Sequence, residues 1–144
     1  MENRNISKPV LQKHPFGCGV ACVAFILGRN YSATLKLFRD GKCKVKNRGF
    51  YCKEIVEVLN KKEAEFEYKY IKDGVRRKIY QDYSIVFVKR SKKYPVGHYL
   101  CRYKNIWIDP WINFQKNQNI KEAEAGSRKR LPGKAVYVIL PKTK

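Results

Sequence analysis

The pattern of apolar residues divides this chain into a helical first part and a strand-rich second part. Residues 20–27 read VACVAFIL, a run that is apolar on every side and ends at Gly28, a common helix stop. Because a helix without a polar face must be buried all round, this run predicts the central helix of the fold. Residues 51–62 carry apolar side chains at helical spacing, and a short helix is expected between the two, at 33–38.

From residue 66 the apolar pattern changes to a period of two, which is typical of strands. Strands are predicted at 66–70, 84–88, 97–103, 106–109 and 135–140. The polar segment 113–133 contains two glycines and is predicted to be a long connection. Helices followed by antiparallel strands indicate an α+β fold, in which the central helix and the helical half pack on a C-terminal sheet. One domain is expected to cover residues 1–144.

The charge adds a constraint on partners. The chain has 32 Lys and Arg against 12 Asp and Glu, a net charge of +20, with small foci at 76–78, 89–93 and 128–130. Residues 42–48 place basic side chains at every second position, which would put them on one side of an extended segment. Such an excess favours an acidic partner, and nucleic acid, an acidic protein, an acidic peptide and an anionic membrane surface all remain open.

The five cysteines indicate reduced thiols rather than a disulfide framework, because their number is odd and the N-terminus has no apolar signal core. No apolar run approaches the ~18 residues that a transmembrane helix needs. A cytoplasmic protein is therefore expected, although a domain excised from a secreted or membrane protein would have the same pattern. A zinc site is the competing use of cysteines, but Cys18-x3-Cys22 differs from the usual Cys-x2-Cys pair. No metal or cofactor is expected.

Cys18 is the candidate nucleophile. It lies between two glycines where the chain enters the apolar helix, and the positive end of the helix dipole stabilises a thiolate there. The flanking glycines would let a substrate approach the backbone. Cys22 lies one turn further along and is predicted to be an inert core thiol. Taken alone, Cys18 is better explained as a small buried residue, and its candidate partners are what favour a nucleophile.

The candidate base is His98. The other histidine, His14, lies in a proline-containing loop and has no evident orienting partner. If Lys104 and Asn105 form a two-residue turn, Asp109 becomes a diagonal cross-strand neighbour of His98 on the same face of the hairpin. Asp109 could then orient the imidazole, whereas a slip of one residue would separate the two side chains. A purely structural His–Asp pair is the alternative.

Gln12 lies six positions before Cys18. Its amide could join the Cys18 backbone N–H in stabilising an oxyanion.

These residues carry a family resemblance. Gln-x5-Cys-Gly-x-Ala-Cys before an apolar helix resembles the opening of papain-like cysteine peptidases, in particular the C39 bacteriocin-processing branch and its C39-like relatives. Gly97-His98-Tyr99 and a hairpin ending in Asp109-Pro110 are similar to the His and Asp motifs of that branch. The resemblance spans about residues 10–140. It implies a papain-like fold, a peptide or protein substrate, and Gln12, Cys18, His98 and Asp109 as oxyanion donor, nucleophile, base and orienting residue.

The sequence therefore predicts a cysteine peptidase or related amide hydrolase. Two alternatives remain. One is a papain-fold toxin domain, acting as a peptidase or deamidase, that an acidic immunity partner neutralises. The other is a basic nucleic-acid-binding domain without catalysis, in which tyrosine-rich strands offer stacking surfaces although no nucleic-acid-binding motif is visible.

Overall fold

The computed structural model describes residues 8–142 and has an α+β architecture, with helices first and strands second. The helices of this part are α1 (Cys18–Leu27), α2 (Tyr31–Leu35), α3 (Gly41–Asn47) and α4 (Cys52–Lys61), with short 3-10 helices at Lys78–Tyr80 and Ile120–Glu122. The strands are β1 (Phe66–Tyr70), β2 (Ile85–Val88), β3 (His98–Tyr103), β4 (Ile106–Asp109), β5 (Gly126–Arg128) and β6 (Ala135–Pro141). The predicted fold class is confirmed. Within the described residues, none of the helices is long and apolar enough to span a membrane.

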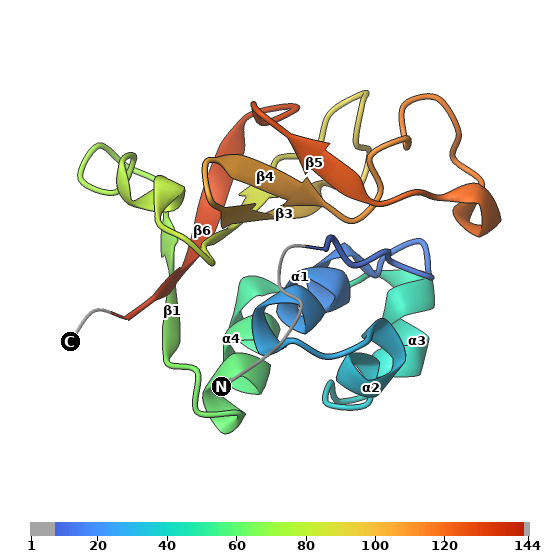
Figure 1. The fold of residues 1–144 in the computed structure, drawn as a ribbon, viewed down its shortest axis with the longest axis horizontal. Helices are drawn as coiled ribbons and strands as arrows, with labels where there is room; N and C mark the ends of the chain where they lie inside the picture. The colour runs from blue at the N-terminus through green and yellow to red at the C-terminus, as the bar shows by residue number, and fades with distance from the viewer. Residues whose placement is uncertain (1–7, 143–144) are drawn as a thin grey trace.

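The apolar run at 20–27 forms the centre of the molecule, as the sequence predicts. Residues 19–26 of α1 are buried, and the helix ends at Gly28, which has a left-handed φ of 68°. The helix packs against β3, with α2 and α4 as helical neighbours. Figure 1 shows α1 directly beneath the sheet. Because α1 has no polar face, burial on all sides fixes its position, and its first residue lies beside the start of β3.

The segment 42–48 is not extended, because residues 42–47 belong to α3, so the condition under which its basic residues would share one side is not met. Lys44 belongs to α3 and Arg48 follows its last residue, so the two lie four residues apart on one face. Lys44 Nζ contacts Glu54 Oε2 at 2.7 Å, and Arg48 Nη2 contacts the same oxygen at 3.0 Å. Glu54 also accepts from the Tyr51 backbone N–H at 2.8 Å, which stabilises the first turn of α4. The basic residues of 42–48 therefore do not all lie on one side, and two of them, Lys44 and Arg48, are paired with Glu54.

The sheet is antiparallel throughout and has the strand order β1-β6-β2-β3-β4-β5. β5 lies within 113–133, so the prediction of one long connection is wrong there. Its three residues, Gly126 to Arg128, have no apolar alternation. They form a strand because they pair with β4, where Asp109 lies opposite Gly126 and Trp107 opposite Arg128. Tertiary pairing alone produces this strand.

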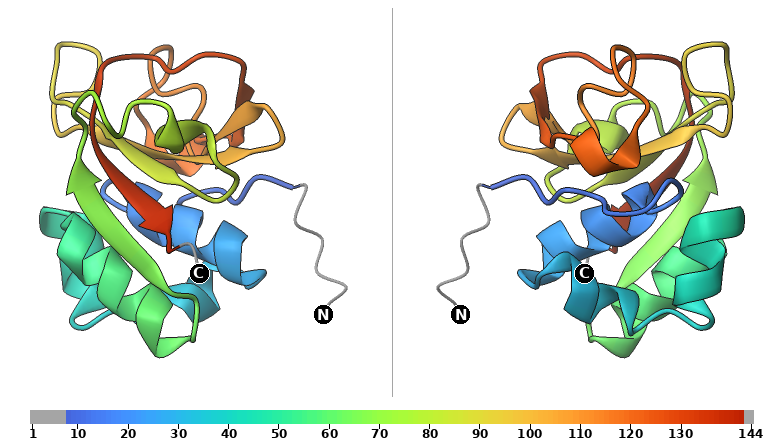
Figure 2. Two further views of the ribbon diagram at one scale, coloured as in Figure 1. Left: turned by 90° about the vertical axis from the view of Figure 1, so that its left-hand side faces the viewer. Right: turned by 90° about the vertical axis from the view of Figure 1, so that its right-hand side faces the viewer.

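Both faces of the sheet are covered. One face contributes Ile85, Tyr99 and Ile139 to a core shared with the helices. The opposite face contributes Leu100, Trp107 and other side chains to a second core beneath the loops and the short helices. The side views in Figure 2 show the helices below the sheet and the long loops above it. His98 alternates with Tyr99, so it lies on the loop-covered face, at the end of β3 that is close to the start of α1.

Candidate active site

Cys18 is the first residue of α1 and is partly exposed. Its Sγ accepts a hydrogen bond from the Tyr99 backbone N–H, with 3.4 Å between the N and S atoms. Both flanking glycines are buried, which corrects the expectation that they admit substrate. A Cβ at Gly17 would overlap the Tyr31 hydroxyl, and one at Gly19 would lie 2.9 Å from Ile55 Cδ1. The glycines therefore make room for protein side chains, and these fix the position of the thiol.

The β3–β4 hairpin has the predicted register. Cys101 pairs with Ile108, Arg102 with Trp107 and Tyr103 with Ile106. Lys104 and Asn105 form the turn, with φ values of 43° and 67°. A positive φ at both central residues is typical of the two-residue turn whose twist matches that of a hairpin.

The hairpin brings His98 and Asp109 into contact. His98 Nε2 donates to Asp109 Oδ1 at 2.7 Å, and both side chains are buried. Burial by itself lowers the pKa of His98, but the hydrogen bonds to Asp109 and then to Cys18 outweigh it and raise that pKa to about 9. The raised pKa favours the imidazolium form of His98 at neutral pH. Since Nε2 is bound to Asp109, Nδ1 is the ring nitrogen that remains for Cys18.

Asp109 has two further partners, and one of them was missed by the sequence analysis. Arg128 Nε donates to Asp109 Oδ2 at 2.7 Å, and the Trp111 backbone N–H donates to Oδ1 at 2.9 Å. Burial raises the pKa of Asp109, but the hydrogen bonds from His98, Arg128 and Trp111 hold it below its usual value. Arg128 belongs to β5, so its role could have been found only by predicting that strand.

Tyr94 is the second residue that the sequence did not indicate. Its buried ring stacks on the His98 imidazole, with the ring centroids 4.8 Å apart and an interplanar angle of 2°. Arg128 Nη2 donates to the Tyr94 hydroxyl at 3.4 Å. Tyr94 and Arg128 thus restrain the imidazole and the carboxylate from the side opposite α1. A loop tyrosine gives no periodic signal in the sequence.

Gln12 is buried near Cys18, but its amide nitrogen is engaged. Nε2 donates to the carbonyl oxygens of His14 at 3.0 Å and Pro15 at 3.3 Å, whereas the buried Oε1 has no partner among the described residues. In this arrangement the amide stabilises the loop that leads into α1. Its role as an oxyanion donor stays a prediction.

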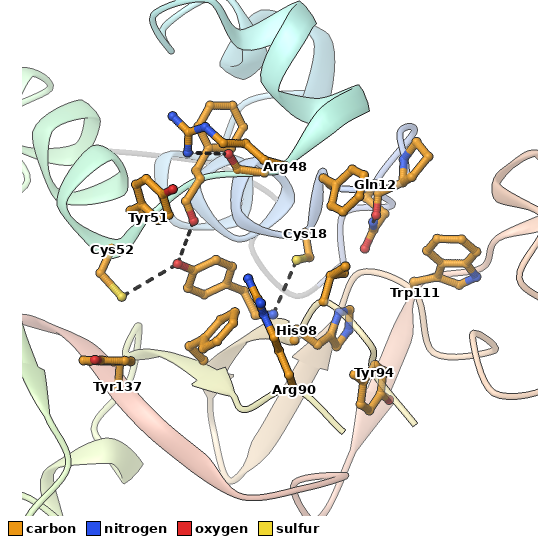
Figure 3. Close-up of a pocket in the computed structure, with 18 of the residues that line it drawn as sticks. Gln12, Cys18, Arg48, Tyr51, Cys52, Arg90, Tyr94, His98, Trp111 and Tyr137 are labelled. Carbon is orange, nitrogen blue, oxygen red and sulfur yellow. Dashed lines mark hydrogen bonds between the residues drawn. The ribbon is translucent and has the colours of Figure 1, made fainter. Parts of the chain in front are cut away.

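A cavity of about 380 Å³ joins these groups, and Gln12, Cys18 and His98 all line it. Figure 3 shows Cys18 near the middle, with Tyr51 and Tyr137 on one side and Trp111 on the other. The cavity therefore extends to both sides of the thiol. Its walls come from the helical layer and from the sheet.

The remaining candidate groups lie outside this arrangement. His14 hydrogen-bonds the Tyr31 hydroxyl at 3.0 Å, and burial and nearby lysines lower its pKa. Cys22 is buried in the core, and burial raises its pKa well above the usual value, as expected of an inert thiol. Among residues 8–142, no group of three or more His, Cys, Asp or Glu side chains is placed to hold a metal ion.

The chain was compared with known proteins. No family model matches it, and no curated protein matches it. Among solved structures it is similar to the peptidase domain of Streptococcus ComA, described as a bi-functional ABC transporter involved in a quorum sensing pathway. The identity is 23%, the TM-score is 0.48, and the alignment covers 92% of this chain and 97% of that domain.

Proposed function

We propose that this chain is a cysteine peptidase that cleaves peptide amide bonds with Cys18, His98 and Asp109. The observation that supports the proposal most is the position of His98 between a buried carboxylate and a thiol at a helix N-terminus. Its Nε2 is bound to Asp109, and its pKa is raised by both Asp109 and Cys18. A nucleophile, a base and a third group that orients the base form an arrangement that supports covalent catalysis by a thiol.

In the first half of the reaction the Cys18 thiolate attacks the carbonyl carbon of the scissile amide. The C–S bond forms, and the carbonyl electron pair moves to oxygen. The backbone N–H of Cys18, in the first turn of α1, can donate to this oxyanion, because such N–H groups lack partners within the helix. Gln12 would contribute a second donor by turning its amide away from the loop carbonyls. The His98 imidazolium then protonates the leaving nitrogen, the C–N bond breaks, and a thioester remains.

In the second half a water molecule hydrolyses the thioester. Neutral His98 accepts a proton from the water as oxygen attacks the carbonyl carbon, and the C–S bond then breaks to release the acid. Asp109 stabilises the imidazolium that forms. Arg128 holds the Asp109 carboxylate in place, and Tyr94 holds the His98 ring. A deamidase would use the same steps. The products distinguish them, because a deamidase releases ammonia and leaves the peptide chain intact.

Alkylation of Cys18 by iodoacetamide between pH 4 and pH 10 tests the thiol–imidazole pair. We expect a rate plateau that extends well below pH ~8.5, where a free thiol ionises, and that is lost in His98→Ala. Because the pKa of His98 is about 9, the ion pair should persist through neutral pH and disappear above pH 9. Cys43 is exposed and serves as an internal reference in the same peptide map.

The matched activity assay uses a tryptic peptide mixture and mass spectrometry. Cys18→Ala and His98→Ala should each lower cleavage by at least about 10³-fold, whereas Cys43→Ala should retain it. Alkylation of Cys18 that rises only near the pH of an ordinary thiol and is unchanged by His98→Ala would contradict the proposal.

A further inference from the structure

We propose that Arg90 binds an acidic side chain of the peptide substrate close to the scissile bond. The inference rests on the proposed peptidase function and adds the chemical class of its substrate. Its basis is the charge of the cavity that contains Cys18, together with the position of Arg90 relative to His98.

In the described part of the chain, basic side chains line the cavity, and acidic side chains do not. Arg48, Lys53 and Arg90 line it, and none of its described lining residues is Asp or Glu. Arg48 is already paired, because its guanidinium contacts Glu54 at 3.0 Å and lies 4.4 Å from the centre of the Tyr51 ring. Arg90 has no hydrogen bond, ion pair or ring contact with any described residue. Its charge is thus available to a ligand.

Arg90 lies just beyond β2, at the end of the sheet where β3 begins with His98. Val88, the last residue of β2, lies directly opposite His98 in β3. Arg90 follows two residues later, beyond the end of β2, and lines the same cavity as His98 and Cys18. Figure 3 shows its side chain directed into the cavity, between Tyr137 and Tyr94. A guanidinium there can form two parallel hydrogen bonds with a carboxylate.

The shape of the cavity favours a side-chain carboxylate over a free C-terminus. The cavity extends to both sides of Cys18, so a peptide can continue past the scissile bond in both directions. Tyr51 and Tyr137 remain 65% and 41% exposed in this cavity, and their rings offer apolar surface to the backbone and to neighbouring side chains. The preferred substrate is therefore an internal peptide segment with Asp or Glu near the bond that is cut.

A pair of alkylating reagents tests the anion site without a known substrate. Iodoacetate and iodoacetamide have nearly the same shape but differ by one negative charge. The rate constant of iodoacetate at Cys18, divided by that of iodoacetamide, should fall about fivefold to tenfold in Arg90→Gln. The measurement is made at ~0.15 M salt to screen distant charges. The control is Arg77→Gln, which removes an equal charge from an exposed position outside the cavity and should keep the ratio. The ratio at Cys43 should be the same in all three proteins.

The cleavage sites in a tryptic peptide mixture give the second measurement. Asp and Glu should be enriched within a few residues of the cut bond, and Arg90→Gln should abolish the enrichment. An unchanged reagent ratio in Arg90→Gln, with the low-pH plateau of iodoacetamide intact, would overturn the Arg90 site while leaving the peptidase proposal standing. Loss of the plateau in the unmodified protein would instead contradict the peptidase proposal. Removal of single C-terminal residues would show that the bound carboxylate is a chain end and would overturn the internal-segment assignment.

Discussion

At the scale of single residues, Asp109 determines the organisation of the site. Its carboxylate is completely buried and receives hydrogen bonds from His98, Arg128 and the Trp111 backbone N–H. A buried charge is tolerated only when it is paired and its lone pairs are occupied. The same three donors that stabilise the ionised carboxylate also fix its orientation towards the imidazole. Asp109 thus links the stability of the fold to the chemistry of the site.

Arg128→Gln tests this link. Removal of the guanidinium leaves the buried Asp109 with fewer donors, so the free energy of unfolding should fall by about 2 kcal/mol. Urea denaturation measures the change, and Arg130→Gln, at an exposed position of the same segment, is the matched control. The loss should be smaller when Asp109→Asn is already present. An equal effect of the two arginine substitutions would show that the Arg128–Asp109 contact contributes nothing to stability.

At the scale of elements, local patterns predicted some parts of the site and not others. The two-residue turn and alternation of β3 and β4 define their register within the hairpin, so the contact between His98 and Asp109 followed from the sequence and is confirmed. The helical break at Gly28 and the all-round apolar run likewise defined α1. These features depend on residues close together in the chain.

Features that depend on distant contacts could not be predicted in this way. β5 exists only through its pairing with β4, so Arg128 had no local signal. The stacking of Tyr94 on His98 depends on the path of the 89–97 loop. In the segment 42–48 a local pattern was present but did not determine the structure. Its alternating basic residues are compatible with an extended segment, yet pairing of Lys44 and Arg48 with Glu54 favours a helix.

Gly97 illustrates how one element is held in place, and it supports a prediction. It has a left-handed φ of 79°, and a Cβ there would overlap the Phe87 ring. Gly97→Ala should therefore destabilise the protein by about 1–3 kcal/mol and displace the start of β3, which slows alkylation of Cys18 at neutral pH. Gly74→Ala is the control, because a Cβ at Gly74 meets nothing within 4 Å. Thermal unfolding and alkylation rates would measure both effects, and equal behaviour of the two variants would contradict the prediction.

At the scale of the whole molecule, the net charge of +20 is partly used by the candidate site. Two of the basic foci in the sequence, at 89–93 and 128–130, each provide one arginine to it. Arg90 lines the cavity, and Arg128 holds Asp109. The nucleic-acid-binding and toxin alternatives depend on the other basic residues, and both stay predictions.

Binding to a short DNA duplex tests the nucleic-acid alternative. We expect at most weak affinity that falls steeply between 50 and 200 mM salt, roughly 10³-fold if six or more phosphates are contacted, because dispersed lysines and arginines contact phosphates without reading bases. Fluorescence anisotropy with two unrelated duplexes measures this, and Cys18→Ser should bind equally. Tight, sequence-selective binding that resists salt would favour nucleic-acid recognition as the main function.

The candidate nucleophile and the candidate base lie in different layers, and this placement has a consequence for the regulation of the proposed activity. Cys18 belongs to the helical layer, whereas His98 and Asp109 belong to the sheet. A misplacement of about 1 Å between reacting groups can lower a rate about a hundredfold. A protein that binds the outer surface of the helices and shifts them slightly against the strands would therefore lower the rate of the proposed reaction without occupying the cavity. Such an inhibitor and the substrate would bind at different places. Each would affect the binding of the other only by changing how the helical layer and the sheet are aligned.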